Sequence, residues 1–260
     1  MPMMGGHHAV SGAAAWMALA SSAQIAGHAT GLDVMGLDGR QVLAGTVVAT
    51  GAALLPDVDH PSATIARSAG GLSRSLTSTV GAVAGHRGAT HTPLAALAFA
   101  AGALLVSGLD WRSTVPLLGE VQVGAVLVVT AMCVFATRAM DIVRVGLTPW
   151  AIGVASGLLV AAFAPDTSIW LPLAVGLGVL VHLLGDLLTT AGVPFPTWPL
   201  VVKPSRSTVW WHANGNIALP LLGDAGSTRE WVLCAAISIY AAAALGATLF
   251  AAAQPMTAAW

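Results

Sequence analysis

The sequence is poor in charged residues: Asp, Glu, Lys and Arg make up 8% of its 260 residues, against roughly 25% in a typical soluble domain. Hydrophobic residues make up 56%. This composition excludes an ordinary water-soluble domain and predicts a membrane protein. The formal net charge is only -1, so we expect no nucleic-acid partner, because binding a polyanion relies on a surplus of Lys and Arg.

Cysteine is scarce as well. Cys133 and Cys234 both lie inside apolar stretches, where they form neither a CxxC metal motif nor a disulfide framework. We expect both to be ordinary buried thiols. The residues before the first apolar stretch, Met1 to Gly6, contain no Lys or Arg. They therefore lack the basic region of a secretory signal peptide, and we expect them to be retained.

Seven apolar stretches approach the roughly 20 residues that a helix needs to cross about 30 Å of hydrocarbon. The first two are the least secure, since one contains polar residues and the other is short. With no internal repeat or separate soluble segment, they predict an all-α fold: a polytopic transmembrane helical bundle of about seven spans, in a single domain over residues 1–260. The stretches cover approximately residues 9–28, 41–55, 93–109, 117–137, 147–164, 169–190 and 231–252.

Basic residues favour one side of this predicted bundle. Cytoplasmic loops are enriched in Lys and Arg, so we expect a multi-pass protein of the inner (plasma) membrane, with its amino terminus in the cytoplasm and the lipid bilayer as its main partner. Only Arg40 and Arg112 then fall on the opposite side. The cytoplasmic side receives the other eight of the ten basic residues: Arg67, Arg74, Arg87, Arg138, Arg144, Lys203, Arg206 and Arg229.

Two segments between the spans are expected at the membrane surface. Residues 65–84 repeat apolar positions at a helical spacing, which predicts a short interfacial helix. A flexible Ser/Gly loop is the alternative, because Gly70 and Gly71 weaken a helix by roughly 1 kcal/mol each. Residues 194–215 contain four prolines and cannot form a regular helix. Their tryptophans are expected to anchor this segment in the interface.

Histidine and aspartate interrupt the apolar pattern in four places. Ionisable groups within membrane spans cost roughly 2.5 to 3.5 kcal/mol on insertion scales, so they indicate function. All four groups reach the inner leaflet in the predicted topology, although that topology rests on Lys and Arg alone. The groups are His8 at the start of the first span, Asp57, Asp59 and His60 after the second, His86 and His91 before the third, and His182 and Asp186 near the end of the sixth.

The local spacing suits shared ligation of an ion. His182 and Asp186 are four residues apart, so a helix places both side chains on one face. Asp57 and Asp59 are two apart beside prolines, and we expect extended backbone there, which aims both carboxylates the same way.

Carboxylates gathered at one membrane depth need cations to stay ionised, and a divalent metal meets that need. Nitrogen and oxygen donors without cysteine suit zinc, with manganese and iron as further candidates. Whether His7 replaces His8 stays open, and an interfacial role is expected for His212. The predicted ligands are His8, Asp57, Asp59, His60, His86, His91, His182 and Asp186.

In this order, the four groups resemble the YdjM-like family of LexA-regulated, membrane-bound, predicted metal-dependent hydrolases. The resemblance implies that the same eight residues form the metal site, and it makes Glu230 a further ligand or base. That family is distantly similar to zinc phospholipase C and P1 nuclease, which implies zinc and a phosphoester substrate. Residues 195–224 match the family pattern only loosely. The matching pieces are His8 to Gly12 (HAVSG), Leu54 to Pro61 (LLPDVDHP), Gly85 to Thr92 (GHRGATHT) and His182 to Pro194 (HLLGDLLTTAGVP).

The leading hypothesis is therefore a membrane-bound metal-dependent hydrolase that acts on a phosphoester, lipid or lipid-linked, at the cytoplasmic leaflet. We expect Asp57 or Asp59 to be a bridging ligand or the general base, and Arg87 to stabilise negative charge on the substrate. Two alternatives stay open. A metal-ion or proton transporter requires polar residues that continue to the far side, and a non-catalytic protein with a structural metal requires a closed site.

Overall fold

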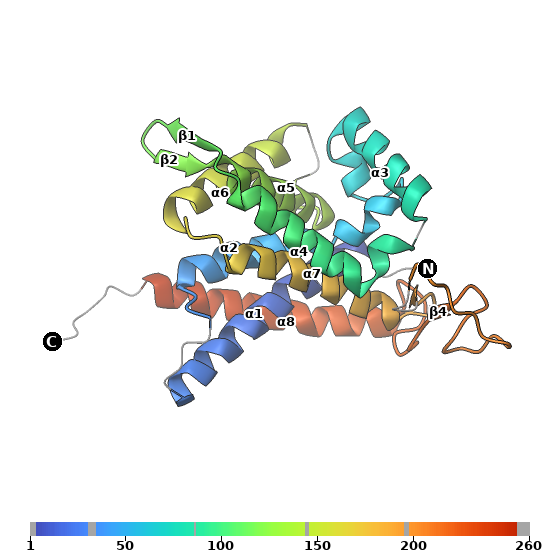
Figure 1. Cartoon of the computed structure of the whole chain (residues 1–260). Coiled ribbons are helices and arrows are strands. Elements are labelled where there is room, and N and C mark those ends of the chain that lie inside the picture. Colours follow the sequence, from blue (N-terminus) through green and yellow to red (C-terminus); the bar gives the residue numbers. More distant parts are fainter. Residues whose placement is uncertain (1–3, 31–34, 86, 144–145, 195–197, 254–260) are drawn as a thin grey trace.

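The computed structural model is mainly helical (Figure 1) and describes residues 4–30, 35–85, 87–143, 146–194 and 198–253. Its α-helices are α1 (Gly5–Thr30), α2 (Gly39–Ala52), α3 (Gly70–Ala84), α4 (Pro93–Gly108), α5 (Val123–Ala139), α6 (Thr148–Phe163), α7 (Trp170–Leu187) and α8 (Thr228–Ala253). Three short 3-10 helices follow or precede them: η1 (Leu55–Asp59), η2 (Ile65–Arg67) and η3 (Ala89–His91). Two antiparallel strand pairs complete the described chain, β1 (Arg112–Val115) with β2 (Gly119–Gln122) and β3 (Val193–Pro194) with β4 (Asn216–Ile217).

Each of the seven predicted apolar stretches contains one α-helix, which confirms the mainly helical fold. Among the described residues, three helices are long and apolar enough to cross a membrane: Gly39–Asp59, which joins α2 to η1, then α7, and Thr228–Ala251 within α8. Helices α4, α5 and α6 are apolar but have only 16 or 17 residues. That all seven apolar stretches cross the membrane stays a prediction.

The fourth predicted span begins later than expected. Residues 117–122 form the turn and second strand of the β1–β2 hairpin, in which Arg112 lies opposite Gln122. Leu117 and Gly119 have φ values of 71° and 79°, in the left-handed region that a right-handed helix excludes. The chain reverses at these residues, and α5 starts only after the hairpin.

The helix predicted over residues 65–84 is present as α3, but it starts later than the apolar pattern does, and its place at the membrane surface stays a prediction. Gly70 adopts a φ of 61° and separates α3 from η2. Helix α3 buries Ser73 and Thr77 against the protein and exposes Leu72, Leu76 and Val83. An apolar stripe that faces outward is typical of a helix that lies against lipid.

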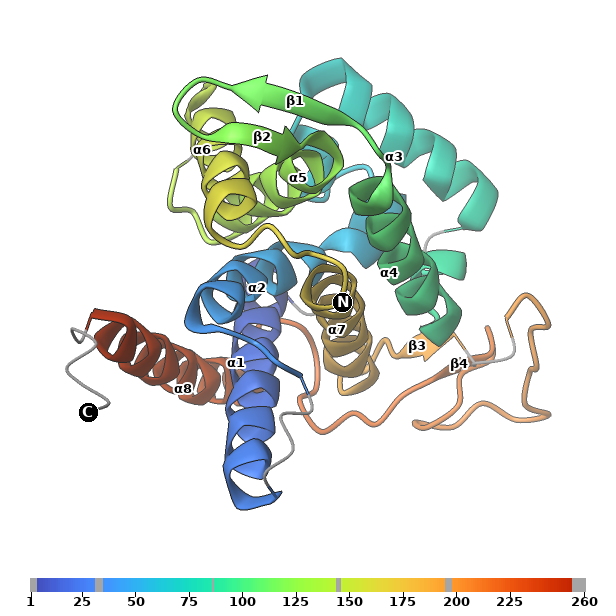
Figure 2. The same cartoon turned by 60° about the vertical axis from the view of Figure 1, so that its left-hand side comes forward.

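Helix α7 lies in the middle of the bundle, between α1 and α2 on one side and α4 on the other (Figures 1 and 2). Its buried face joins a core that includes Trp16, Val48 and Val129. Close packing depends on small residues: a Cβ added at Gly178 would lie 2.6 Å from the carbonyl oxygen of Ala49 in α2. Glycine thus lets the two backbones approach, as is common in membrane helix pairs.

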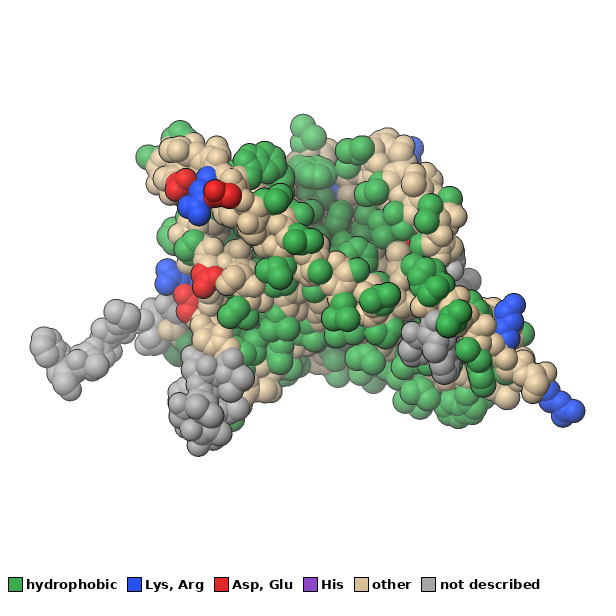
Figure 3. Space-filling view, viewed as in Figure 1, with side chains coloured by type: hydrophobic (Ala, Val, Ile, Leu, Met, Phe, Trp, Pro, Cys, Tyr) green, Lys and Arg blue, Asp and Glu red, His purple; other side chains and the backbone are tan. Residues whose placement is uncertain are grey.

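The surface reflects the same organisation. In Figure 3, charged side chains gather towards the two ends of the bundle, and the surface between them is largely hydrophobic or uncharged. Large exposed apolar side chains include Leu97 and Leu105 on α4 and Ile239 and Phe250 on α8. Such a belt is suited to lipid contact and would be costly in water.

Candidate metal centre

Histidine and aspartate side chains from four elements meet at one end of the bundle. His8 on α1, His91 on η3, and His182 and Asp186 on α7 are each at most 1% exposed. Asp57 on η1 borders them, and 23% of its side chain is exposed. Two groups, His8 with His182 and Asp186, and Asp57 with His91 and His182, each place three ligand atoms within 4.8 Å of one another. Five of the eight predicted ligands therefore lie together.

The hydrogen bonds of His182 and His91 determine which ring nitrogens face the cluster. His182 Nδ1 lies 2.7 Å from the carbonyl oxygen of Ala53 and must carry the proton, which leaves Nε2 as the unprotonated nitrogen of a neutral ring. His91 Nδ1 lies 3.1 Å from the Thr90 hydroxyl oxygen, whose own proton is donated to Asp59 Oδ2, and 3.4 Å from that carboxylate oxygen. Both neighbours are acceptors, so Nδ1 carries the proton of this ring as well. The two Nε2 atoms then lie 3.3 Å apart. Their lone pairs repel each other unless a cation lies between them.

Asp186 is the carboxylate that approaches all three rings. Its Oδ1 lies 3.4 Å from His8 Nε2, and its Oδ2 lies 3.6 Å from His91 Nε2 and 3.7 Å from His182 Nε2. The ring of His8 stacks on that of His182 with centroids 3.7 Å apart, and neither nitrogen of His8 has a hydrogen-bond partner among the described residues. A buried imidazole with unsatisfied nitrogens fits a metal ligand better than a packing residue.

His60, before Pro61, has the expected extended backbone. The expectation is wrong for Asp57 and Asp59, which point to different sides of His91. Pro56 is the second residue of the 3-10 helix η1, whose three residues per turn separate side chains two apart by about 120°. Asp57 Oδ1 lies 3.9 Å from the Nε2 atoms of both His91 and His182. Asp59 Oδ2 instead accepts hydrogen bonds from the Arg87 backbone N (2.8 Å) and the Thr90 hydroxyl (2.7 Å).

Arg87 is buried against the cluster in a left-handed backbone conformation, with φ of 55°. Its guanidinium donates to Asp186 Oδ2 and, at 2.7 Å, to the carbonyl oxygen of Gly192. These bonds use two of its five N–H groups. A buried cation against the Asp186 carboxylate reduces the electrostatic cost of burying that group and offers donors to an anion.

The other predicted residues are placed differently. His86 lies outside the described residues. His60 Nδ1 lies 2.8 Å from the hydroxyl of Ser62, and His60 belongs to neither ligand group. Glu230 is fully buried and pairs with His7 Nδ1; it also accepts hydrogen bonds from the backbone N of Met4 and of Gly226. It therefore connects the start of α8 to the start of the chain.

Two supporting contacts were not predicted from the sequence. The Thr90 hydroxyl lies between Asp59 and His91, and its only sequence signal is its position next to that histidine. The carbonyl oxygen of Ala53 fixes His182, and a backbone atom leaves no signal at all.

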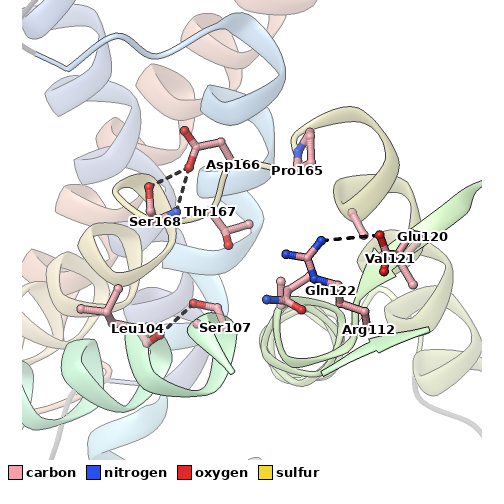
Figure 4. A pocket seen from close by; sticks show the side chains of 13 residues that line it. Leu104, Ser107, Arg112, Glu120, Val121, Gln122, Pro165, Asp166, Thr167 and Ser168 are labelled. Carbon is pink, nitrogen blue, oxygen red and sulfur yellow. Dashed lines mark hydrogen bonds and ion pairs between the residues drawn. The ribbon is translucent and has the colours of Figure 1, made fainter. Parts of the chain in front are cut away.

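A separate pocket of about 320 Å3 lies at the opposite end, between the β1–β2 hairpin and the start of α7 (Figure 4). Arg112 and Gln122 point into it from one wall and Thr167 from the other. The Ser168 hydroxyl and backbone N donate to Asp166 and lower the pKa of its carboxyl group. The residues that line this pocket include no histidine or cysteine, so it lacks the ligand types of the metal centre.

A family model described as YdjM inner membrane protein matches residues 3–255. The matched range contains every residue of the cluster. No curated protein and no solved structure matches the chain.

Proposed function

Because the chain belongs to the YdjM inner membrane protein family, we propose that its buried cluster is the divalent-metal centre of a membrane-embedded hydrolase. The observation that carries this proposal is the pair of Nε2 atoms of His91 and His182, which face each other at 3.3 Å while both Nδ1 atoms are held by hydrogen-bond acceptors. Imidazole and carboxylate donors of this kind suit zinc, with manganese or iron as alternatives.

The roles of the residues follow from their contacts. His91, His182, Asp57 and Asp186 are proposed as ligands, with His8 completing the set on the far side of His182. A divalent ion bound there would polarise a phosphoryl oxygen and make water more acidic. Asp57 is the one carboxylate of this set with a partly exposed side chain, so it is the group proposed to meet incoming water, as a ligand or general base.

Groups behind the proposed ligands set the orientation of those ligands. Asp59 holds His91 from its Nδ1 side, and the carbonyl of Ala53 does the same for His182. A carboxylate or carbonyl behind a ligating histidine fixes its tautomer and raises its basicity. Arg87, with N–H groups beyond those bonded to Asp186 and Gly192, is proposed to stabilise the negative charge that develops on a phosphoester.

The substrate class is proposed from location. The cluster lies at an end of helices apolar enough to cross a membrane, on the side where the predicted topology places most basic residues. A phosphoester carried by a lipid would reach this depth from the cytoplasmic leaflet.

The test starts with metal content. The full chain, purified in detergent without a metal-affinity tag and supplied with zinc, should hold near-stoichiometric metal by mass spectrometry, and His182→Ala and Asp186→Ala should lose it. Asp166→Ala, at the opposite end, is the matched control and should keep it. Zinc-loaded protein should then hydrolyse bis-p-nitrophenyl phosphate. A wild type that stays metal-free refutes the proposal, and bound zinc without hydrolysis favours a structural metal instead.

A further inference from the structure

A pocket of about 220 Å3 lies beside the metal centre, between Arg87 and the loop that connects β3 to β4. Asn214 and Asn216 supply polar groups to it, and Trp198 and Val201 supply apolar surface. Arg87 is part of both the pocket and the metal centre, because its guanidinium donates a hydrogen bond to Asp186 in the cluster. A molecule in this pocket therefore contacts a residue that touches a proposed metal ligand.

The pocket has a defined polar wall. Asn214 Oδ1 accepts a hydrogen bond from the Asn216 backbone N at 3.0 Å, which leaves the NH2 group of Asn214 to donate elsewhere. Gly215 between them has a φ of 94°, and a Cβ there would lie 2.8 Å from Val201 Cγ1. Only glycine combines this backbone conformation with so close an approach. The turn thus holds an amide donor opposite Arg87.

The loop beyond the pocket is amphipathic. We call residues 198–211 the arm. Leu200 is 75% exposed, Val209 64% and Trp210 54%, and Lys203 and Arg206 are exposed among them. In Figure 1 the loop next to β4 extends from the end of the bundle where α8 begins, and in Figure 3 basic side chains project from that end. Exposed apolar and aromatic side chains next to Lys and Arg are typical of segments that enter the headgroup region of an anionic leaflet.

We propose that the arm inserts among lipid headgroups and that the pocket at its base binds the phosphate-bearing head group of a lipid substrate. The proposal rests on the proposed function, since it names the substrate of the same centre. Arg87 and Asn214 donate to phosphate oxygens, and Val201 and Leu200 give the acyl chains an apolar path back to the bilayer. The ligand is thus an anionic phospholipid, recognised by its phosphate and by its acyl chains.

Calorimetry on the full chain in detergent tests this directly, with and without zinc supplied. The probes are dihexanoyl phosphatidic acid, below its micellar concentration, and glycerol 3-phosphate, which has the same phosphate but no acyl chains. Wild type should bind the lipid more tightly. Asn214→Ala should weaken both probes about fivefold, the effect of losing one hydrogen bond, whereas Gln122→Ala, an amide in the opposite pocket, should change neither.

Leu200→Ser should weaken lipid binding and leave glycerol 3-phosphate unaffected, because it removes part of the apolar path of the acyl chains without adding a charge. Equal affinity of wild type for the two probes would show that the site takes free phosphate and overturn the lipid assignment. An Asn214→Ala variant that binds both probes like wild type would overturn the pocket itself. Zinc content is measured on the same samples, so a failure of the metal centre is recognised separately.

Discussion

Asp59 offers the sharpest test of how the metal centre is built, because the sequence predicts a ligand and the geometry suggests a supporting role. Its Oδ2 accepts from the Arg87 backbone N and the Thr90 hydroxyl and faces His91 Nδ1, on the side of the ring turned away from His182. Asp59→Asn can place its amide oxygen at the same point. It keeps these hydrogen bonds and removes the negative charge behind His91.

The magnitudes follow from that difference. Loss of a supporting partner behind a ligating histidine lowers metal affinity about 10- to 100-fold, or roughly 1.4 to 2.7 kcal/mol. Asp59→Asn should lie near the lower limit. Asp59→Ala should lie near the upper limit, and it should also lower the free energy of unfolding by about 1 to 3 kcal/mol, since buried donors of Arg87 and Thr90 lose their acceptor.

Zinc affinity is measured by competition with a chromophoric chelator, on detergent-purified protein whose helical content is checked by circular dichroism. Asp166→Asn is the matched control, the same change in an exposed carboxylate at the opposite end, and it should bind zinc like wild type. If Asp59→Asn abolishes zinc binding as Asp186→Asn does, Asp59 is a direct ligand and the supporting role is refuted. If its affinity equals that of wild type, the carboxylate does not influence His91.

Three further predictions use other parts of the fold. Glu230→Gln should lower the thermal unfolding temperature, because its amide NH2 must face His7 or a backbone N–H in a buried site. Its zinc content should stay unchanged, and loss of zinc would instead make Glu230 a ligand. Gly178→Ala should force α7 away from α2 and weaken zinc binding. The control Gly102→Ala, whose added Cβ meets no atom within 4 Å, should bind zinc like wild type. Equal zinc affinities of the two variants would show that the packing of α7 on α2 does not influence the metal centre. Arg87→Lys should lower kcat for bis-p-nitrophenyl phosphate about tenfold or more, because lysine cannot form the same planar fork; an unchanged rate at full zinc occupancy would remove Arg87 from the mechanism.

The residues that sequence reasoning placed well are those whose geometry depends on one regular helix. His182 and Asp186 share a face of α7, as their spacing predicts. Helical periodicity converts such a spacing directly into a direction. The segments that contain the seven main helices could be predicted for the same reason, since long apolar runs allow few other structures in a membrane.

The errors fall where the backbone is irregular. The pattern Asp57-Val58-Asp59 fits extended backbone as well as a 3-10 turn. Extended backbone would aim both carboxylates the same way, whereas the 3-10 turn places them on different sides of His91. The hairpin before α5 was missed because Leu117 and Leu118 are apolar enough to continue a span, and hydropathy does not register the left-handed turn at Gly119. Both cases depend on φ and ψ at single residues, and these angles cannot be read from hydropathy averaged over a stretch of sequence.

The position of the cluster along α7 bears on the choice between hydrolysis and transport. A path for ions across the membrane requires polar side chains at successive depths. The buried face of α7 carries His182 and Asp186 in its last two turns, but the residues that precede them on that face are apolar: Trp170, Leu171, Ala174, Val175, Gly178 and Val179. Those side chains belong to or adjoin the main core, in which α7 packs against α1, α2 and α4. Along this helix the polar residues end where the core begins, an arrangement that suits a centre reached from one leaflet and opposes a continuous ion path.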